Sequence, residues 1–97
     1  MARLQDLTIY AMDYADIFGE NFTHCEVELD ERSNQILISR NVKSNHIRRV
    51  VVEFKRDVIT VRTVNIFAGA IDSEIVKQYF DEDTDVLDLY DDVLALI

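Results

Sequence analysis

The spacing of apolar residues changes twice along the chain, and these changes limit the possible folds more than any other feature. Apolar residues first recur every three or four positions, as in a helix with one buried side. From Phe22 to Phe67 they recur at every second position, as in strands with one buried face. Gly19 is expected to end the helix. The helical positions are Leu4, Leu7, Ala11, Tyr14, Ala15 and Phe18.

The alternating segment divides into two hairpins. Asp30–Asn34 and Lys55–Asp57 are polar and suit turns, and each lies between two runs that are rich in β-branched residues. Val50–Val52 is apolar at three consecutive positions, which indicates an interior strand. We therefore expect four antiparallel strands.

Beyond Ala68–Ala70 the sequence favours helix again. Asp72 or Ser73 suits the N-cap of a short helix, and a longer amphipathic helix is expected at the end of the chain. The predicted fold class is α+β, in a single domain over residues 1–97. It has an N-terminal helix, a four-stranded antiparallel sheet of two hairpins, and one or two C-terminal helices packed on one face of the sheet.

Charge is distributed unevenly along the chain. The 97 residues include 19 acidic and 10 basic residues, for a net charge of −9. Residues 1–31 carry −7, residues 32–66 carry +6 and residues 67–97 carry −8. Such asymmetry suggests an interaction surface, since net charge bears on solubility and partners rather than on fold.

The acidic residues of the two end segments recur at helical spacing and form the candidate partner-binding site. Carboxylates on two helices can attract a basic protein groove, and apolar residues among them can supply desolvated contacts. Met12 and Leu89 are further expected contacts, as are Tyr79 and Tyr90 if they are exposed. The alternative is a solvated face that only keeps the protein soluble. The candidate site residues are Asp6, Ile9, Asp13, Asp16, Glu20, Asp81, Glu82, Asp83, Asp85, Asp88 and Asp92.

No other pattern indicates a chemical site. The Asp-rich run that begins at Asp81 resembles the start of a calcium loop, but Val86 occupies the position of the required glycine. His24 and Cys25 are adjacent, so on a strand they point to opposite faces. His24 and His46 could meet across strands as a pH-sensitive pair. The chain has no phosphate-binding loop or nucleophile motif. We expect no enzyme activity, cofactor or metal.

The basic middle segment raises the possibility of nucleic-acid binding. Its cations include Arg40, Arg48, Arg49 and Arg62, which could line one surface of the sheet. Phosphate binding would have to overcome repulsion from the acidic ends, and the strands lack the aromatic pattern on which bases stack. Direct nucleic-acid binding is therefore the weaker hypothesis.

In size, acidity and expected architecture the chain resembles small inhibitors that occupy the basic surface of a nucleic-acid-binding enzyme. These include phage-encoded defence inhibitors, DNA mimics and toxin immunity proteins; the resemblance covers no specific motif. It implies a basic protein surface as partner. The alternative is a self-associating assembly protein, whose open sheet edge could pair in a homodimer. With no apolar leader at the N-terminus and no run of eighteen apolar residues, we expect a cytoplasmic protein without a membrane span.

Overall fold

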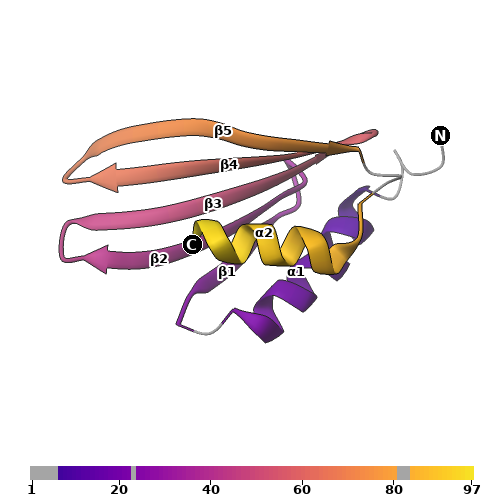
Figure 1. Ribbon diagram of the computed structural model, residues 1–97, viewed down its shortest axis with the longest axis horizontal. Coiled ribbons are helices and arrows are strands. Elements are labelled where there is room, and N and C mark those ends of the chain that lie inside the picture. Colours follow the sequence, from indigo (N-terminus) through magenta and orange to yellow (C-terminus); the bar gives the residue numbers. More distant parts are fainter. Residues whose placement is uncertain (1–6, 23, 81–83) are drawn as a thin grey trace.

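The computed structural model describes residues 7–22, 24–80 and 84–97. The described chain contains two helices and a five-stranded sheet (Figure 1). The elements in order are α1 (Leu7–Asn21), β1 (Glu26–Asp30), β2 (Gln35–Lys43), β3 (His46–Lys55), β4 (Val58–Phe67), β5 (Ala70–Phe80) and α2 (Val86–Leu96).

The sheet is an antiparallel meander in which every strand pairs with the next one in sequence. The two predicted hairpins are confirmed as β1–β2 and β3–β4, with turns at Asp30–Gln35 and Lys55–Val58. Asn34 has a φ of 51°, a left-handed conformation that asparagine tolerates. Val50 and Val52 are fully buried in β3, the central strand, as expected of an interior strand.

The prediction of four strands and a possible second C-terminal helix is wrong. The segment predicted as a short helix after Asp72 is β5, which pairs with β4 along its whole length. The turn before it explains the difference. Ala68 and Gly69 both have positive φ, 46° and 92°, and they join Phe67 directly to its cross-strand partner Ala70. Two consecutive positive φ angles match the twist of a two-residue hairpin, so the chain folds back as a strand.

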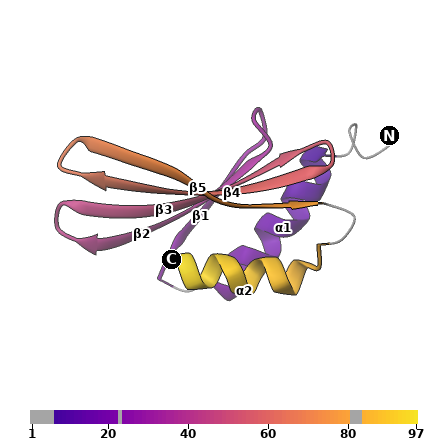
Figure 2. The ribbon, with the colours of Figure 1, turned by 45° about the horizontal axis from the view of Figure 1, so that its top comes forward.

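Both helices lie on the same side of the sheet, as predicted (Figure 2). Alternate residues of the strands face them, and the two layers enclose one hydrophobic core. The buried core consists of Ala11, Tyr14, Phe18, Phe22, Ile36, Ile38, Val50, Val52, Phe54, Ile59, Val61, Leu89 and Val93.

Helix α1 is held by aromatic packing. Tyr14 and Phe18 are buried one turn apart, with ring centroids 5.9 Å apart, and Tyr14 also contacts Phe54 of β3. Phe22 continues this row and packs against Tyr90 of α2. Gly19 does not end the helix, which continues to Asn21, where the side-chain amide donates to the Ile17 carbonyl.

The sheet is longer than the helix layer that covers it. The molecule measures 43 × 25 × 22 Å, and β2–β5 extend past the C-terminal end of α2 (Figure 1). At this end Arg48 donates through Nε to the Leu96 carbonyl of α2. A cation suits the C-terminus of a helix, where the macrodipole is negative.

Candidate partner-binding surface

Helix α1 presents an acidic stripe on the side away from the sheet. Asp13, Asp16 and Glu20 are exposed, and Ile9 and Met12 are exposed among them, with 61% and 42% of their surface accessible. At 100° per residue these five positions fall within about a third of the helix circumference. The predicted mixture of carboxylates and apolar side chains is therefore present on one face of α1.

Helix α2 presents a second stripe, in a different phase from the predicted one. Asp88 is exposed as expected, and Asp91 is exposed as well, whereas the predicted Asp92 is half-buried. Leu87 and Leu94 lie beside Asp91 on the helix surface and are 64% and 48% exposed. Neither helix contains a Lys, Arg or His. Within the described helices, the exposed charge is thus entirely negative.

A shallow hollow separates α2 from β5. It has a volume of about 410 Å³ and is lined by Lys77 and Tyr79 of β5 and by Thr84 near the start of α2. Its remaining lining residues are Asp85, Asp88, Asp91 and Asp92. Several carboxylates around one depression form a suitable acceptor for an arginine or lysine side chain of a partner.

Asp92 is anchored to the sheet, although its side chain is 45% exposed. Its carboxylate accepts a 2.6 Å hydrogen bond from the Tyr79 hydroxyl and lies 3.4 Å from Lys77 Nζ. The Tyr79 hydrogen bond lowers the pKa of Asp92; partial burial opposes this shift, and the nearby Lys77 cation adds to the lowering. Burial, followed by the Asp92 hydrogen bond, raises the pKa of Tyr79. Asp92 thus connects α2 to β5.

Asp85 has a local structural role. It is the N-cap of α2, and its carboxylate accepts a 2.9 Å hydrogen bond from the Leu87 amide. An aspartate here satisfies a backbone donor that the helix leaves unpaired, and its charge suits the positive end of the helix dipole. Its exposed position also leaves it at the edge of the hollow.

Three expected contact residues face inward. Leu89 is fully buried, so its prediction as a contact residue is wrong. Tyr90 is half-buried, packs on Phe22 with ring centroids 4.9 Å apart and donates to the Asn21 carbonyl. Tyr79 is also half-buried and is engaged with Asp92. The exposed apolar residues of α2 are instead Leu87 and Leu94.

Four candidates lie outside the described residues: Asp6, Asp81, Glu82 and Asp83. The run that resembles the start of a calcium loop falls largely on them. Among the residues that are described, no three His, Cys, Asp or Glu side chains are grouped to hold a metal ion.

The basic middle segment is balanced by acids within the sheet itself. Between residues 26 and 80 there are nine Lys and Arg against eight Asp and Glu. A hollow of about 270 Å³ near the start of β1 is lined by side chains of both signs, including Glu26, Glu28 and Arg49. The excess negative charge therefore belongs to the two helices and to residues 81–85.

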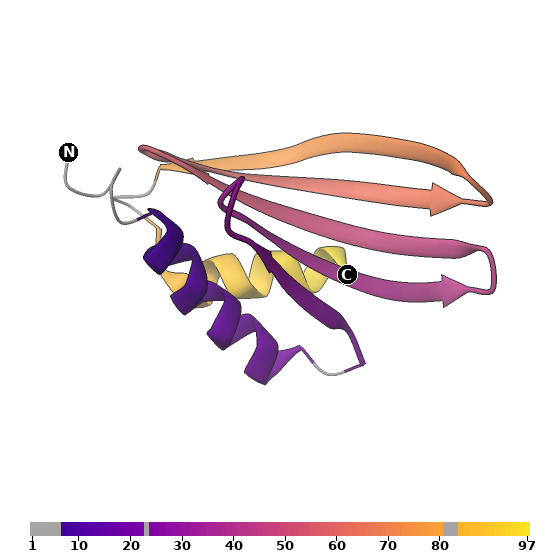
Figure 3. The ribbon, with the colours of Figure 1, turned by 180° about the vertical axis from the view of Figure 1, so that it is seen from behind.

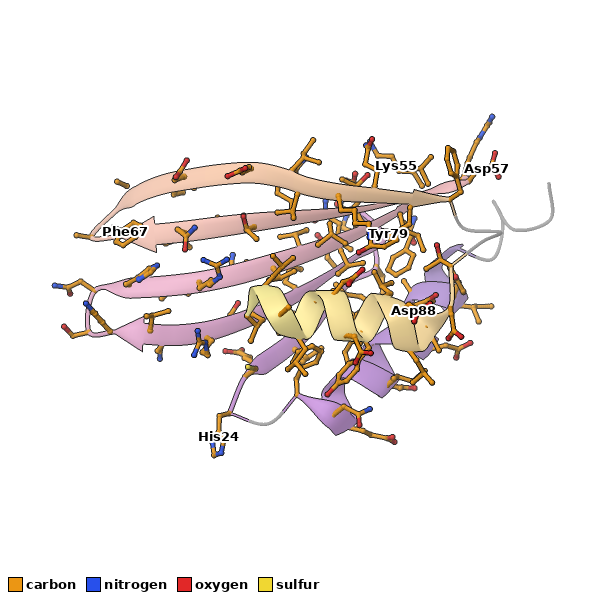
Figure 4. The ribbon with its side chains drawn as sticks, in the orientation of Figure 1. His24, Lys55, Asp57, Phe67, Tyr79 and Asp88 are labelled. Atoms are coloured by element: carbon orange, nitrogen blue, oxygen red, sulfur yellow. The ribbon has the colours of Figure 1, made fainter. Side chains whose placement is uncertain are left out.

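The histidines and the cysteine do not form a site. His46 stacks on Phe67 at 4.0 Å and shares a 3.0 Å hydrogen bond with Asn65. His24 is exposed at the start of the sheet, with a φ of 61° (Figure 4). Cys25 is partly buried against the core, which suits a small apolar residue.

The comparisons with known proteins identify no relative: no protein-family model, curated protein or solved structure matches the chain. In the described part of the chain, neither helix has the length and hydrophobicity needed to cross a membrane.

Proposed function

We propose that the chain is a small, non-enzymatic binding protein that occludes a basic, nucleic-acid-binding surface of a partner protein. DNA mimics, phage-encoded defence inhibitors and toxin immunity proteins work in this way. The observation that carries the proposal is the sign of the exposed charge on the helix layer. Every charged residue of α1 and α2 is acidic, and the sheet beneath is close to neutral.

The helix layer has the two properties that such a contact requires. Its carboxylates would steer a basic partner and make association fast at low salt. Its exposed apolar residues would then hold the complex, because charge alone contributes little once a surface pair stays hydrated. Ile9 and Met12 serve this role on α1, and Leu87 and Leu94 serve it on α2.

The acidic hollow gives the proposal a chemical preference. An arginine that enters it would meet exposed carboxylates of Asp85, Asp88 and Asp91 without displacing a core residue. Nucleic-acid-binding proteins present arginines for phosphate contacts, so the same side chains would be engaged by either ligand. The chain and a polyanion such as DNA should therefore compete for the same surface of the partner.

The test compares two acidic stripes with a matched control. Asp13→Lys with Asp16→Lys changes α1, Asp88→Lys with Asp91→Lys changes α2, and Glu26→Lys with Glu28→Lys changes β1, all exposed pairs with the same charge change. Immobilised chains capture host proteins at low salt, and duplex DNA is then used to elute them. We expect capture of a basic nucleic-acid-binding protein that DNA displaces.

The affinity of the purified partner then locates the surface. We expect the two helix variants to weaken binding by about tenfold or more and the β1 variant to have a much smaller effect. We also expect the unmodified chain to inhibit the DNA binding of the partner. Equal losses in all three variants, or a partner that DNA does not displace, would contradict the proposal.

A further inference from the structure

Strand β5 is an exposed edge strand of unusual length. It spans 11 residues and is the last strand of the sheet, so its outer backbone edge faces away from β4. All its residues except Tyr79 are exposed, including Ile71 at 71%, Ile75 at 53% and Phe80 at 69%. Its outer amide and carbonyl groups form a template that another strand can extend.

A β-bulge at the middle of β5 sets which face each side chain occupies. Lys77 pairs with Val61 and Ile75 pairs with Arg62, so Val76 is the additional residue. Before and after this residue, successive side chains of β5 alternate between the two faces of the sheet. Asp72, Glu74, Lys77 and Tyr79 consequently face the helix side, whereas Ile71, Ser73, Ile75, Gln78 and Phe80 face the open side.

The two halves of β5 are complementary about this bulge. If two copies pair antiparallel about the midpoint between Ile75 and Val76, each pair of opposed residues lies on one face of the combined sheet. Glu74 then lies opposite Lys77 of the second copy, and the two-fold axis repeats this pair. The other opposed pairs are Ile71 with Phe80, Ser73 with Gln78, and Asp72 with Tyr79.

We propose that the protein forms a homodimer through antiparallel pairing of β5 with β5 of a second copy. The axis is perpendicular to the sheet, and the result is one continuous ten-stranded sheet with all four helices on one side. Glu74 meets Lys77 and Ile71 meets Phe80, so the pairing brings together two opposite charges and two apolar side chains, as a self-complementary two-fold interface requires. The pairing does not depend on the proposed function.

The two members of each complementary pair are an odd number of positions apart in the sequence, and this spacing supports the proposed pairing. In a regular strand, residues an odd number of positions apart point to opposite faces, so Glu74 and Lys77 could not oppose each other across the axis. The bulge removes this mismatch and brings both to the helix side. The structural irregularity and the side-chain pattern therefore share the same midpoint.

The test is a charge swap, with mass measured by light scattering and by sedimentation over a range of concentrations. The unmodified chain is expected to reach twice 11.3 kDa. Glu74→Lys opposes like charges twice and is expected to weaken the dimer by about tenfold or more. The double variant Glu74→Lys with Lys77→Glu restores opposite charges and is expected to restore the dimer.

A second pair of variants separates edge pairing from contact through the helices. Ile75→Lys places charge at the centre of the interface and is expected to give a monomer, whereas Leu87→Lys on α2 is expected to leave the dimer intact. Slowed hydrogen exchange of the β5 amides in the dimer would support backbone pairing. A monomer at all concentrations, a dimer lost in Leu87→Lys but not in Ile75→Lys, or a charge swap without rescue would overturn the proposal.

Discussion

The two edge strands of the same sheet are built in opposite ways. Strand β1 has 5 residues, lies beside α1 (Figure 3) and points Val27 and Leu29 towards the helix layer. Strand β5 has 11 residues and is exposed on both faces over nearly all its length. Both strands pair fully with their neighbours, so pairing alone does not explain why one edge is short and covered and the other is long and exposed.

The side chains explain the contrast. The open side of β1 carries Glu26 and Glu28, and two such edges would repel each other. Short length and like charge are the usual protections of an edge strand. Strand β5 has neither, since it is long and its charges, Asp72, Glu74 and Lys77, are of both signs. The comparison teaches that one edge is closed to further strands and the other is suited to them.

The largest expected effect is the difference between matched truncations on the two edges. Leu29→Ala should lower the free energy of unfolding by about 2 kcal/mol, because Leu29 packs against the core of buried residues. Ile71→Ala should change it by less than about 0.5 kcal/mol, because the side chain is 71% exposed. Urea denaturation measures both, in a Glu74→Lys background that weakens β5 pairing. Equal losses would mean that the two edges are equally buried.

The next effect concerns the turn that makes β5 a strand. Gly69→Val should destabilise the fold by about 1.5 kcal/mol, because a β-branched residue is strained at a φ of 92°. Gly69→Asn should cost less, since asparagine tolerates positive φ. Gly19→Ala in α1 is the opposite control and should stabilise by about 0.5 kcal/mol, since nothing lies within 4 Å of the added carbon. Thermal unfolding distinguishes them, and no loss in Gly69→Val would exclude a strict role for this turn.

The same contrast shows which parts of the fold the sequence can predict. The strands β1–β4 bury one face under the helices, so burial leaves an alternating pattern that the sequence displays. Strand β5 buries neither face, and its apolar residues Ile71, Ile75 and Val76 show no such period. The segment Ala68–Ala70 was interpreted as a break before a helix, although Ala68 and Gly69 form a hairpin turn. A strand that is held only by backbone pairing therefore has no alternating apolar pattern by which its sequence can be recognised.

The sequence predicted the negative charge of the candidate surface but not which side of α2 is exposed. Counting along the sequence indicated that the end segments are acidic and helical, and the exposed Asp13, Asp16 and Asp88 agree with that. The sequence could not show which of Asp91 and Asp92 is the more exposed. Adjacent helix positions differ by 100°, and each of the two residues can be placed on a stripe with Asp88. The choice depends on where β5 lies. Since β5 was predicted as helix, its contact with Asp92 through Tyr79 could not be foreseen.

The smallest expected effect tests the hydrogen bond between Tyr79 of β5 and Asp92 of α2. Tyr79→Phe removes the hydrogen bond to Asp92 and should cost about 1 kcal/mol, because both groups are partly exposed. The pKa of Asp92 should rise towards its ordinary value of 3.8, which a titration followed by NMR would detect. Tyr90→Phe, which removes a longer 3.4 Å hydrogen bond to the Asn21 carbonyl, is the matched control and should leave Asp92 unchanged.

The pH dependence gives this prediction its sign. The folded pKa of Asp92 lies below its unfolded value, so its contribution is complete above about pH 4 and is lost as the pH falls through the folded value. The folded pKa of Tyr79 is raised, so the same hydrogen bond persists up to about pH 10 and is lost only as the pH rises through the folded value. The unmodified chain should therefore exceed Tyr79→Phe in stability by a constant amount between these limits. A difference that varied within that range would mean that another group holds α2 to β5.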